Sequence, residues 1–181
     1  MYHLEMYIQV IDEPALNHLF TLFVNVVMAY IQMLRQVQKI PVTLEQAWEF
    51  FSQPKNLAVL TPAHLNLRFT NELIMDEIYP GQIITYHVKP ILGIPFFWMT
   101  EITHVERLKF FVDEQRRGPY AFWHHQHHFR QLEGGVEMTD IIHYQLPFGV
   151  FGNIGKVVIQ KQLRQIFEYR RRKIGELFGI L

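Results

Sequence analysis

Apolar and polar residues alternate over several short stretches in the middle of the chain, a pattern typical of half-buried β-strands. These stretches are rich in aromatic and β-branched residues, and turn-forming groups such as Tyr79-Pro80-Gly81 and Glu133-Gly134-Gly135 separate them. We therefore expect an antiparallel meander, with strands at residues 30–40, 66–70, 83–88, 96–105, 110–116, 121–132 and 136–146.

The pattern changes to helical spacing at two places. After Pro41, the segment Thr43-Leu44-Glu45-Gln46 has the sequence of a capping box and predicts the start of a helix, and residues 56–60 predict a second, short one. Near the end, residues 153–178 predict a long amphipathic helix, because apolar residues recur there at three- and four-residue steps. These are Ile159, Leu163, Ile166, Phe167, Ile174, Leu177 and Phe178.

This order of elements predicts an α+β fold in one domain. A curved antiparallel sheet of about seven strands, two short helices after the first strand, and a long C-terminal helix across the concave face would enclose a pocket. A length of 181 residues agrees with a single domain, which we place at residues 30–181.

Residues 1–29 form an N-terminal extension with an apolar segment. We expect either an additional amphipathic helix that begins near Pro14 or a mis-assigned start, with Met28 or Met33 as the first natural residue. A signal peptide or membrane anchor is disfavoured, because Asn17 and Asn25 interrupt the segment and no Lys or Arg precedes Arg35.

Composition narrows the functional classes. The 17 basic and 17 acidic residues balance, whereas a protein that coats nucleic acid is expected to be basic. The absence of Cys excludes disulfides and thiolate chemistry and fits a cytoplasmic location. Aromatic residues reach 14%, which favours an aromatic-walled cavity for a small apolar ligand.

The Gly134-Gly135 pair predicts a two-residue hairpin turn that sets Glu133 opposite Val136. With that register, one face of the hairpin carries Trp123, His125, His127, Phe129, Met138, Asp140, Ile142 and Tyr144, and we expect it to be concave because it is the more apolar face. A tight turn at Gly118-Pro119 would add Phe110 and Val112 to this face and turn Glu114 inward.

The predicted ligand-binding residues come from these strands, from the strands at residues 83–88 and 96–105, and from the last helix. They are Tyr86, Trp98, Phe110, Val112, Trp123, His125, His127, Phe129, Asp140, Ile142, Tyr144, Leu163 and Phe167.

The run His124-His125-Gln126-His127-His128 carries the candidate chemistry. Two His at i and i+2 on a strand can share a metal ion, but no third ligand is evident, with Asp140 only diagonal to His127, so we expect no metal and no other cofactor. The same three side chains, His125, His127 and Asp140, are the candidates for acid–base catalysis.

A basic cluster, Arg170-Arg171-Arg172-Lys173, lies on the last helix. We interpret it first as part of a solvated helix face, with its cations near the negative C-terminal end of the helix. The alternative is a weak contact with an anionic membrane surface or a partner.

Three segments carry a resemblance to a known family. Ile40-Pro41-Val42-Thr43 with Trp48 resembles the opening of START-like, or SRPBCC, proteins. The stretch at residues 113–120 followed by Trp123, His125 and His127, and the stretch at residues 136–149, resemble the bacterial branch labelled polyketide cyclase/dehydrase, coenzyme-Q-binding or ligand-binding SRPBCC protein. The resemblance covers about residues 30–178.

The resemblance implies a helix-grip fold, in which a seven-stranded sheet wraps a long C-terminal helix over a hydrophobic cavity. It also implies binding of lipids, sterols, quinones or polyketides, and in some members ring closure or dehydration. No catalytic motif is common to the family. The first hypothesis is therefore a non-enzymatic binder of a small hydrophobic ligand, as a monomer or homodimer, and the alternatives are a cyclase/dehydratase and a lipid-surface or partner-binding module.

Overall fold

The computed structural model describes residues 31–70, 77–91, 93–146 and 152–181 of the chain. Within them one antiparallel sheet of seven strands has the spatial order β1-β7-β6-β5-β4-β3-β2. The elements are β1 (Gln32–Ile40), α2 (Leu44–Phe51), the 3-10 turns η1 (Pro54–Leu57) and η2 (Ala63–Leu65), β2 (Arg68–Phe69), β3 (Ile83–Ile91), β4 (Ile94–Glu106), β5 (Phe110–Arg117), β6 (Phe122–Leu132), β7 (Gly135–Gln145) and α3 (Gly152–Phe178).

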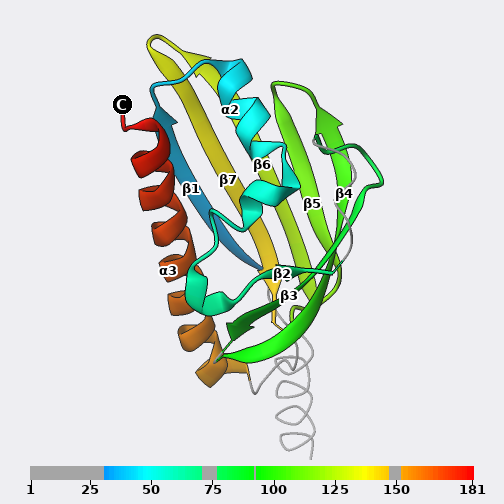
Figure 1. The fold of residues 1–181 in the computed structure, drawn as a ribbon. Helices are drawn as coiled ribbons and strands as arrows, with labels where there is room; N and C mark the ends of the chain where they lie inside the picture. Colours follow the sequence, from blue (N-terminus) through cyan, green and yellow to red (C-terminus); the bar gives the residue numbers. More distant parts are fainter. Residues whose placement is uncertain (1–30, 71–76, 92, 147–151) are drawn as a thin grey trace, which may run out of the picture.

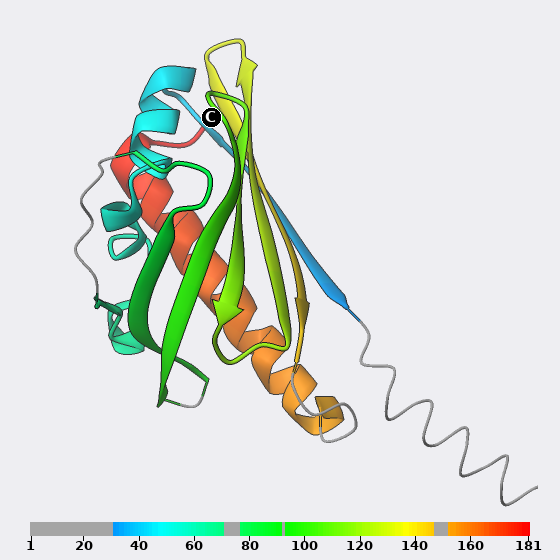
Figure 2. The ribbon, with the colours of Figure 1, turned by 90° about the vertical axis from the view of Figure 1, so that its right-hand side faces the viewer.

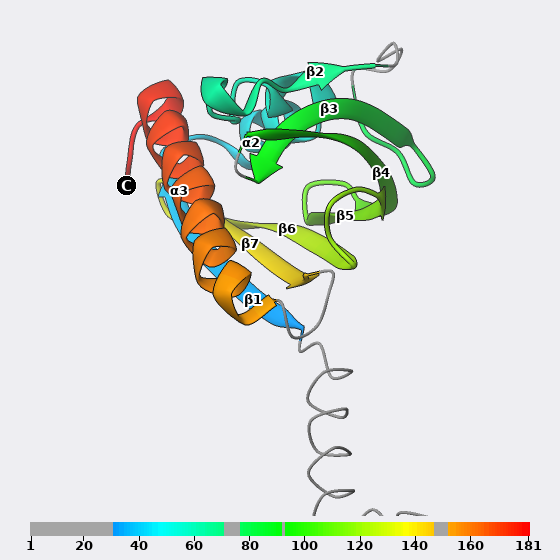
Figure 3. The ribbon, with the colours of Figure 1, turned by 90° about the horizontal axis from the view of Figure 1, so that it is seen from below.

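The sheet curls so that its two ends approach the long helix from opposite sides. Seen from below, the strands form an arc from β1 round to β3, and α3 lies at the open side of this arc (Figure 3). The short helix α2 lies over the middle strands on the same face as α3 (Figure 1), and the side view shows α3 running diagonally behind the strands (Figure 2). The α+β helix-grip architecture predicted from the sequence is confirmed.

Helix α2 begins where the capping box predicts. The Thr43 hydroxyl accepts a hydrogen bond from the Gln46 backbone N–H, and the Gln46 side chain accepts one from the Thr43 backbone N–H. The predicted helix at residues 56–60 is wrong in type. The chain there forms the end of the 3-10 turn η1 and then turn residues 58–60, because Pro62 disfavours a helical conformation of the residue before it and cannot donate a helical hydrogen bond.

The β6–β7 hairpin has the predicted faces but a different register. Leu132 pairs with Gly135, so Glu133 and Gly134 form the turn, and Gly134 has a positive φ of 79°. Gly135 lies inside β7, where a Cβ atom would come within 2.1 Å of the Ile40 carbonyl oxygen. The shift moves each residue by two positions relative to its predicted partner and therefore leaves its face unchanged.

The β5–β6 register differs from the prediction by one residue, which exchanges the faces of β5. Phe110 pairs with His128, Val112 with Gln126, and Glu114 with His124, all on the outer row, so the predicted inward positions of Phe110, Val112 and Glu114 are wrong. The predicted tight turn is a longer loop, residues 118–121, in which the Gln115 side chain donates to the Tyr120 carbonyl and accepts from the Tyr120 N–H. Phe111 and Asp113 face inward instead.

The core lies between the concave face of the sheet and the two helices. Its largest fully buried apolar side chains are Ile40, Trp48, Val136, Ile142 and Ile174. The N-terminal extension predicted at residues 1–29 lies outside the described residues. No helix in the described parts of the chain is long and apolar enough to cross a membrane.

Candidate functional site: a buried histidine–aspartate cluster beside two cavities

Two adjoining cavities lie between the sheet and the helices. The smaller has a volume of about 100 Å³ and extends toward α2, and the larger has about 130 Å³ and lies beneath α3. The two cavities share part of their walls, which is formed by Leu57, Leu60, Tyr86, His125 and Arg170. The hollow expected between sheet and C-terminal helix is thus present, as two small compartments.

The predicted ligand-binding residues fall into three groups. Tyr86, Trp98, Trp123, His125, His127, Leu163 and Phe167 line one or both cavities. Phe129, Asp140, Ile142 and Tyr144 are buried but do not border them. Phe110 and Val112 are on the outer row of β5, as described above, and Phe111 lines the smaller cavity in their place.

The cavity wall contains a closed cluster of two histidines and two aspartates. Asp113 Oδ2 lies 2.8 Å from His127 Nε2 and 3.3 Å from His125 Nδ1. On the other side of the same two rings, Asp140 Oδ1 lies 2.9 Å from His127 Nδ1 and 3.3 Å from His125 Nε2. Each imidazole therefore has one nitrogen toward each carboxylate, and the two ring centroids are 3.8 Å apart.

Arg170 of α3 completes this cluster on the Asp140 side. Its guanidinium lies 3.6 Å from Asp140 Oδ1 and 3.5 Å from His127 Nδ1. His127 Nδ1 cannot both donate to Asp140 and accept from Arg170. Its distance to Asp140 Oδ1, 2.9 Å, is the shorter of the two, so we assign the hydrogen bond from His127 Nδ1–H to Asp140.

The electrostatics follow from this geometry. Burial opposes the charged form of Asp140, yet its pKa is held well below its usual range by the Arg170 charge and by hydrogen bonds from His125 and His127. Burial likewise opposes ionisation of Asp113, but His125 and His127 lower its pKa. Burial alone would lower the pKa of His125, whereas the charge and hydrogen bond of Asp113, followed by those of Asp140, raise it.

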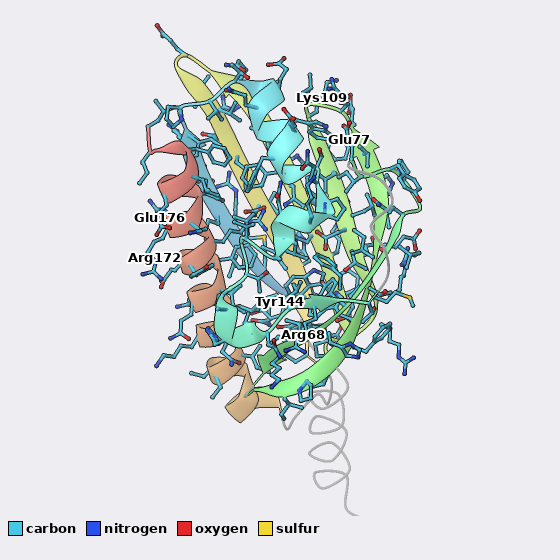
Figure 4. The ribbon with its side chains drawn as sticks, viewed as in Figure 1. Arg68, Glu77, Lys109, Tyr144, Arg172 and Glu176 are labelled. Atoms are coloured by element: carbon cyan, nitrogen blue, oxygen red, sulfur yellow. The ribbon has the colours of Figure 1, made fainter. Side chains whose placement is uncertain are left out.

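The prediction that the basic cluster lies on a solvated helix face is wrong for Arg170. It is 8% exposed and faces the core, while Arg171 and Arg172 are exposed and Lys173 forms an ion pair with Glu176. Arg172 and Glu176 lie on the side of α3 that faces away from the sheet (Figure 4). Of the predicted cluster, Arg171, Arg172 and Lys173 would therefore remain for a membrane contact.

Asp113 and Arg170 are the site residues that sequence reasoning missed. The signal for Arg170 was present in the helix, because position 170 continues the apolar stripe through Leu163, Phe167 and Ile174. Asp113 had no comparable signal, since its direction depends on the loop between β5 and β6.

Two buried donors next to the cavities have no hydrogen-bond partner among the described residues. They are Trp98 Nε1, beside the larger cavity, and Arg170 Nε, whose side chain borders both. An unpaired buried donor is costly, so each is suited to an acceptor atom of a ligand. For a metal ion, the described residues offer Asp113, His125 and His127, whose ligand atoms lie within 4.8 Å of one another.

Comparison with known proteins identifies the fold. No protein-family model and no curated protein sequence matches the chain. Among solved structures, it is similar to protein CV1439 from Chromobacterium violaceum, with a TM-score of 0.62, 10% identity, and coverage of 81% of this chain and 96% of that chain. It is also similar to protein Ms6760 from Mycobacterium smegmatis, with a TM-score of 0.58, 15% identity, and coverage of 82% and 95%.

A plant protein shares the same architecture. Ginseng major latex-like protein 151 from Panax ginseng matches with a TM-score of 0.58, 13% identity, and coverage of 82% of this chain and 97% of that chain. These neighbours are START-like (SRPBCC) proteins, so the resemblance seen in the sequence is confirmed at the level of the fold.

Proposed function

We propose that this START-like fold binds a small hydrophobic ligand, lipid, quinone or polyketide-like, in the two cavities between the sheet and α3. The observation that carries the proposal is the pair of adjoining cavities. Aromatic and aliphatic side chains wall them, and buried donors with no hydrogen-bond partner among the described residues border them. Apolar walls with a few placed polar groups are the usual composition of a ligand site.

The size of the cavities narrows the ligand class. A cavity of ~150 Å³ lined by apolar side chains holds one benzene ring. The compartments of about 100 and 130 Å³ therefore suit a compact molecule with one or two rings, which favours a quinone or a polyketide-like compound over a long acyl chain. Trp98 Nε1 and Arg170 Nε would donate to carbonyl or hydroxyl oxygens of such a molecule.

Ligand binding is tested by native mass spectrometry of the protein purified from its own host and by titration with menadione. Trp98 and Trp123 line the larger cavity, so menadione should quench tryptophan fluorescence. Leu163→Trp fills this cavity from α3 and should weaken menadione binding at least tenfold. Val157→Trp, at a position of α3 that is 68% exposed, is the matched control and should bind as the parent does.

Two results would contradict the proposal. One is the absence of any co-purified small molecule together with no quenching by menadione. The other is equal menadione binding by the parent, Leu163→Trp and Val157→Trp proteins, which would place the quencher outside the cavity.

The position of the histidine–aspartate cluster supports a second candidate, a cyclase or dehydratase. His125 and His127 line the smaller cavity, and each contacts two carboxylates. Such an arrangement is suited to moving a proton to or from a bound carbonyl compound. Incubation with linear 1,5-diketones, which can close a six-membered ring by aldol addition and then lose one water, should give the cyclised enone, and His127→Gln should abolish this product. A panel that gives no dehydrated product would contradict this activity.

A further inference from the structure

On the Asp113 side of the cluster, two of the three separations between candidate ligand atoms match those of a metal site, and all three lie within 4.8 Å. Asp113 Oδ2 lies 2.8 Å from His127 Nε2 and 3.3 Å from His125 Nδ1. Ligand atoms bound at ~2.1 Å to one ion in octahedral or tetrahedral geometry are ~3.0 to ~3.4 Å apart. The oxygen–nitrogen separations in the protein are close to these values.

The other side of the rings has the contacts that metal-bound histidines usually make. A ligating imidazole donates its second N–H to a carboxylate or carbonyl, which selects its tautomer and orientation. Asp140 Oδ1 lies within 3.3 Å of His125 Nε2 and 2.9 Å of His127 Nδ1, so one carboxylate orients both rings. With protons on these two nitrogens, His125 Nδ1 and His127 Nε2 carry lone pairs toward Asp113.

A cation resolves a conflict that hydrogen bonds alone leave. If all four contacts are hydrogen bonds, both imidazoles must be protonated, which places two like charges with centroids 3.8 Å apart in a buried site. If the rings are neutral, they offer two protons for the four contacts, and with those protons on the Asp140 side three acceptor atoms converge at Asp113. One divalent ion between Asp113, His125 and His127 satisfies all three acceptors.

The surrounding charges also permit a divalent cation. With neutral imidazoles, Asp113, Asp140 and Arg170 sum to one negative charge. The contacts of Arg170 are to Asp140 and to the Asp140-facing nitrogen of His127. Asp113, His125 and His127 border the cavity of about 100 Å³, so further coordination positions can open into it.

We propose that Asp113, His125 and His127 bind one divalent transition-metal ion, with Asp140 as the residue that orients both imidazoles. Two nitrogen ligands and one carboxylate suit Zn²⁺, Co²⁺ or Fe²⁺, whereas Mg²⁺ and Ca²⁺ prefer oxygen ligands. The proposed metal site does not depend on the identity of the organic ligand.

Cobalt titration of the full chain, without a histidine tag and after chelator treatment, tests the site. We expect one Co²⁺ per chain, visible d–d absorption, and displacement by Zn²⁺. Asp113→Asn should weaken Co²⁺ binding at least tenfold, and Asp140→Asn should weaken it 10- to 100-fold through loss of ring orientation. His128→Gln, on the outer row of the same strand, should bind Co²⁺ as the parent does.

A spectroscopic measurement on the parent protein tests the site even if the variants do not fold. The parent with Co²⁺ should show two exchangeable, hyperfine-shifted imidazole N–H signals in its proton NMR spectrum, from His125 and His127. The proposal is overturned if the parent binds no stoichiometric Co²⁺, if folded Asp113→Asn binds it as well as the parent does, or if these signals are absent. Menadione quenching measured in the metal-free protein tests ligand binding separately.

Discussion

At the residue scale, the cluster depends on Asp140, which is 2% exposed. This carboxylate accepts from both imidazoles and lies 3.6 Å from the Arg170 guanidinium. A carboxylate on the outer face of the sheet contributes much less to stability. Glu137, three residues earlier on β7, pairs with Arg130, whose side chain is 68% exposed and largely solvated.

We predict that Asp140→Asn destabilises the metal-free protein by about 3 kcal/mol, because it leaves the buried Arg170 cation without its counter-charge. Urea unfolding of chelator-treated protein measures the effect. Glu137→Gln makes the same chemical change on the outer side of β7 and should cost much less, because its partner Arg130 is largely solvated. Equal losses in the two variants would show that Asp140 and Arg170 are not coupled in the folded protein.

At the element scale, the β6–β7 hairpin shows two different requirements for glycine. Gly134 supplies the positive φ of the turn, and Gly135 permits the close approach of β7 to the Ile40 carbonyl at the end of β1. The requirement at Gly135 also explains the observed register, because the turn is formed by Glu133 and Gly134 while Gly135 remains in the strand.

Gly135→Ala should therefore be more harmful than Gly134→Ala. The Cβ at position 135 meets backbone atoms, and we expect a loss of about 2–3 kcal/mol from overpacking. The Cβ at position 134 has open space except for Leu181, so only the backbone strain of about 1 kcal/mol remains. Thermal and urea unfolding of the two variants measure the difference, and the reverse order would contradict the close approach to Ile40.

At the scale of the whole molecule, closure of the sheet on α3 buries tyrosines that line the larger cavity. Burial raises the pKa of Tyr86 despite a hydrogen bond with Thr100 that lowers it, and burial together with Tyr144 raises the pKa of Tyr120, so both keep their protons in the folded state well above pH 10. In the unfolded chain both ionise near their ordinary pKa of ~10. Above this pH the unfolded state therefore binds fewer protons than the folded state, and stability falls as pH rises.

Each such tyrosine should contribute a loss of about 1.4 kcal/mol per pH unit above ~10. Tyr120→Phe removes one of these groups, and the free energy of unfolding, measured in urea between ~pH 9 and ~pH 11, should then decline less steeply by about that amount. Below ~pH 9, where both states are protonated, the Tyr120→Phe difference should be independent of pH. Parallel curves over the whole range would mean that Tyr120 is not buried as the structure shows.

The sequence by itself determined the features that depend on local periodicity. The alternation of apolar and polar residues identified the strands, the capping box located the start of α2, and the spacing along residues 153–178 identified α3. Because neighbouring strand residues point to opposite faces, the inner row with His125, His127 and Asp140 was predictable even though the register of the hairpin was not.

Only the tertiary structure decided which charged groups meet inside. Asp113 turns inward because the Gln115 side chain supports a longer loop before β6, and one residue of register exchanges the faces of β5. Arg170 reaches Asp140 because α3 packs across the curled sheet, a contact between residues 30 positions apart that local periodicity does not encode. The same closure produces the two cavities, whose volume depends on how side chains from distant elements fit together.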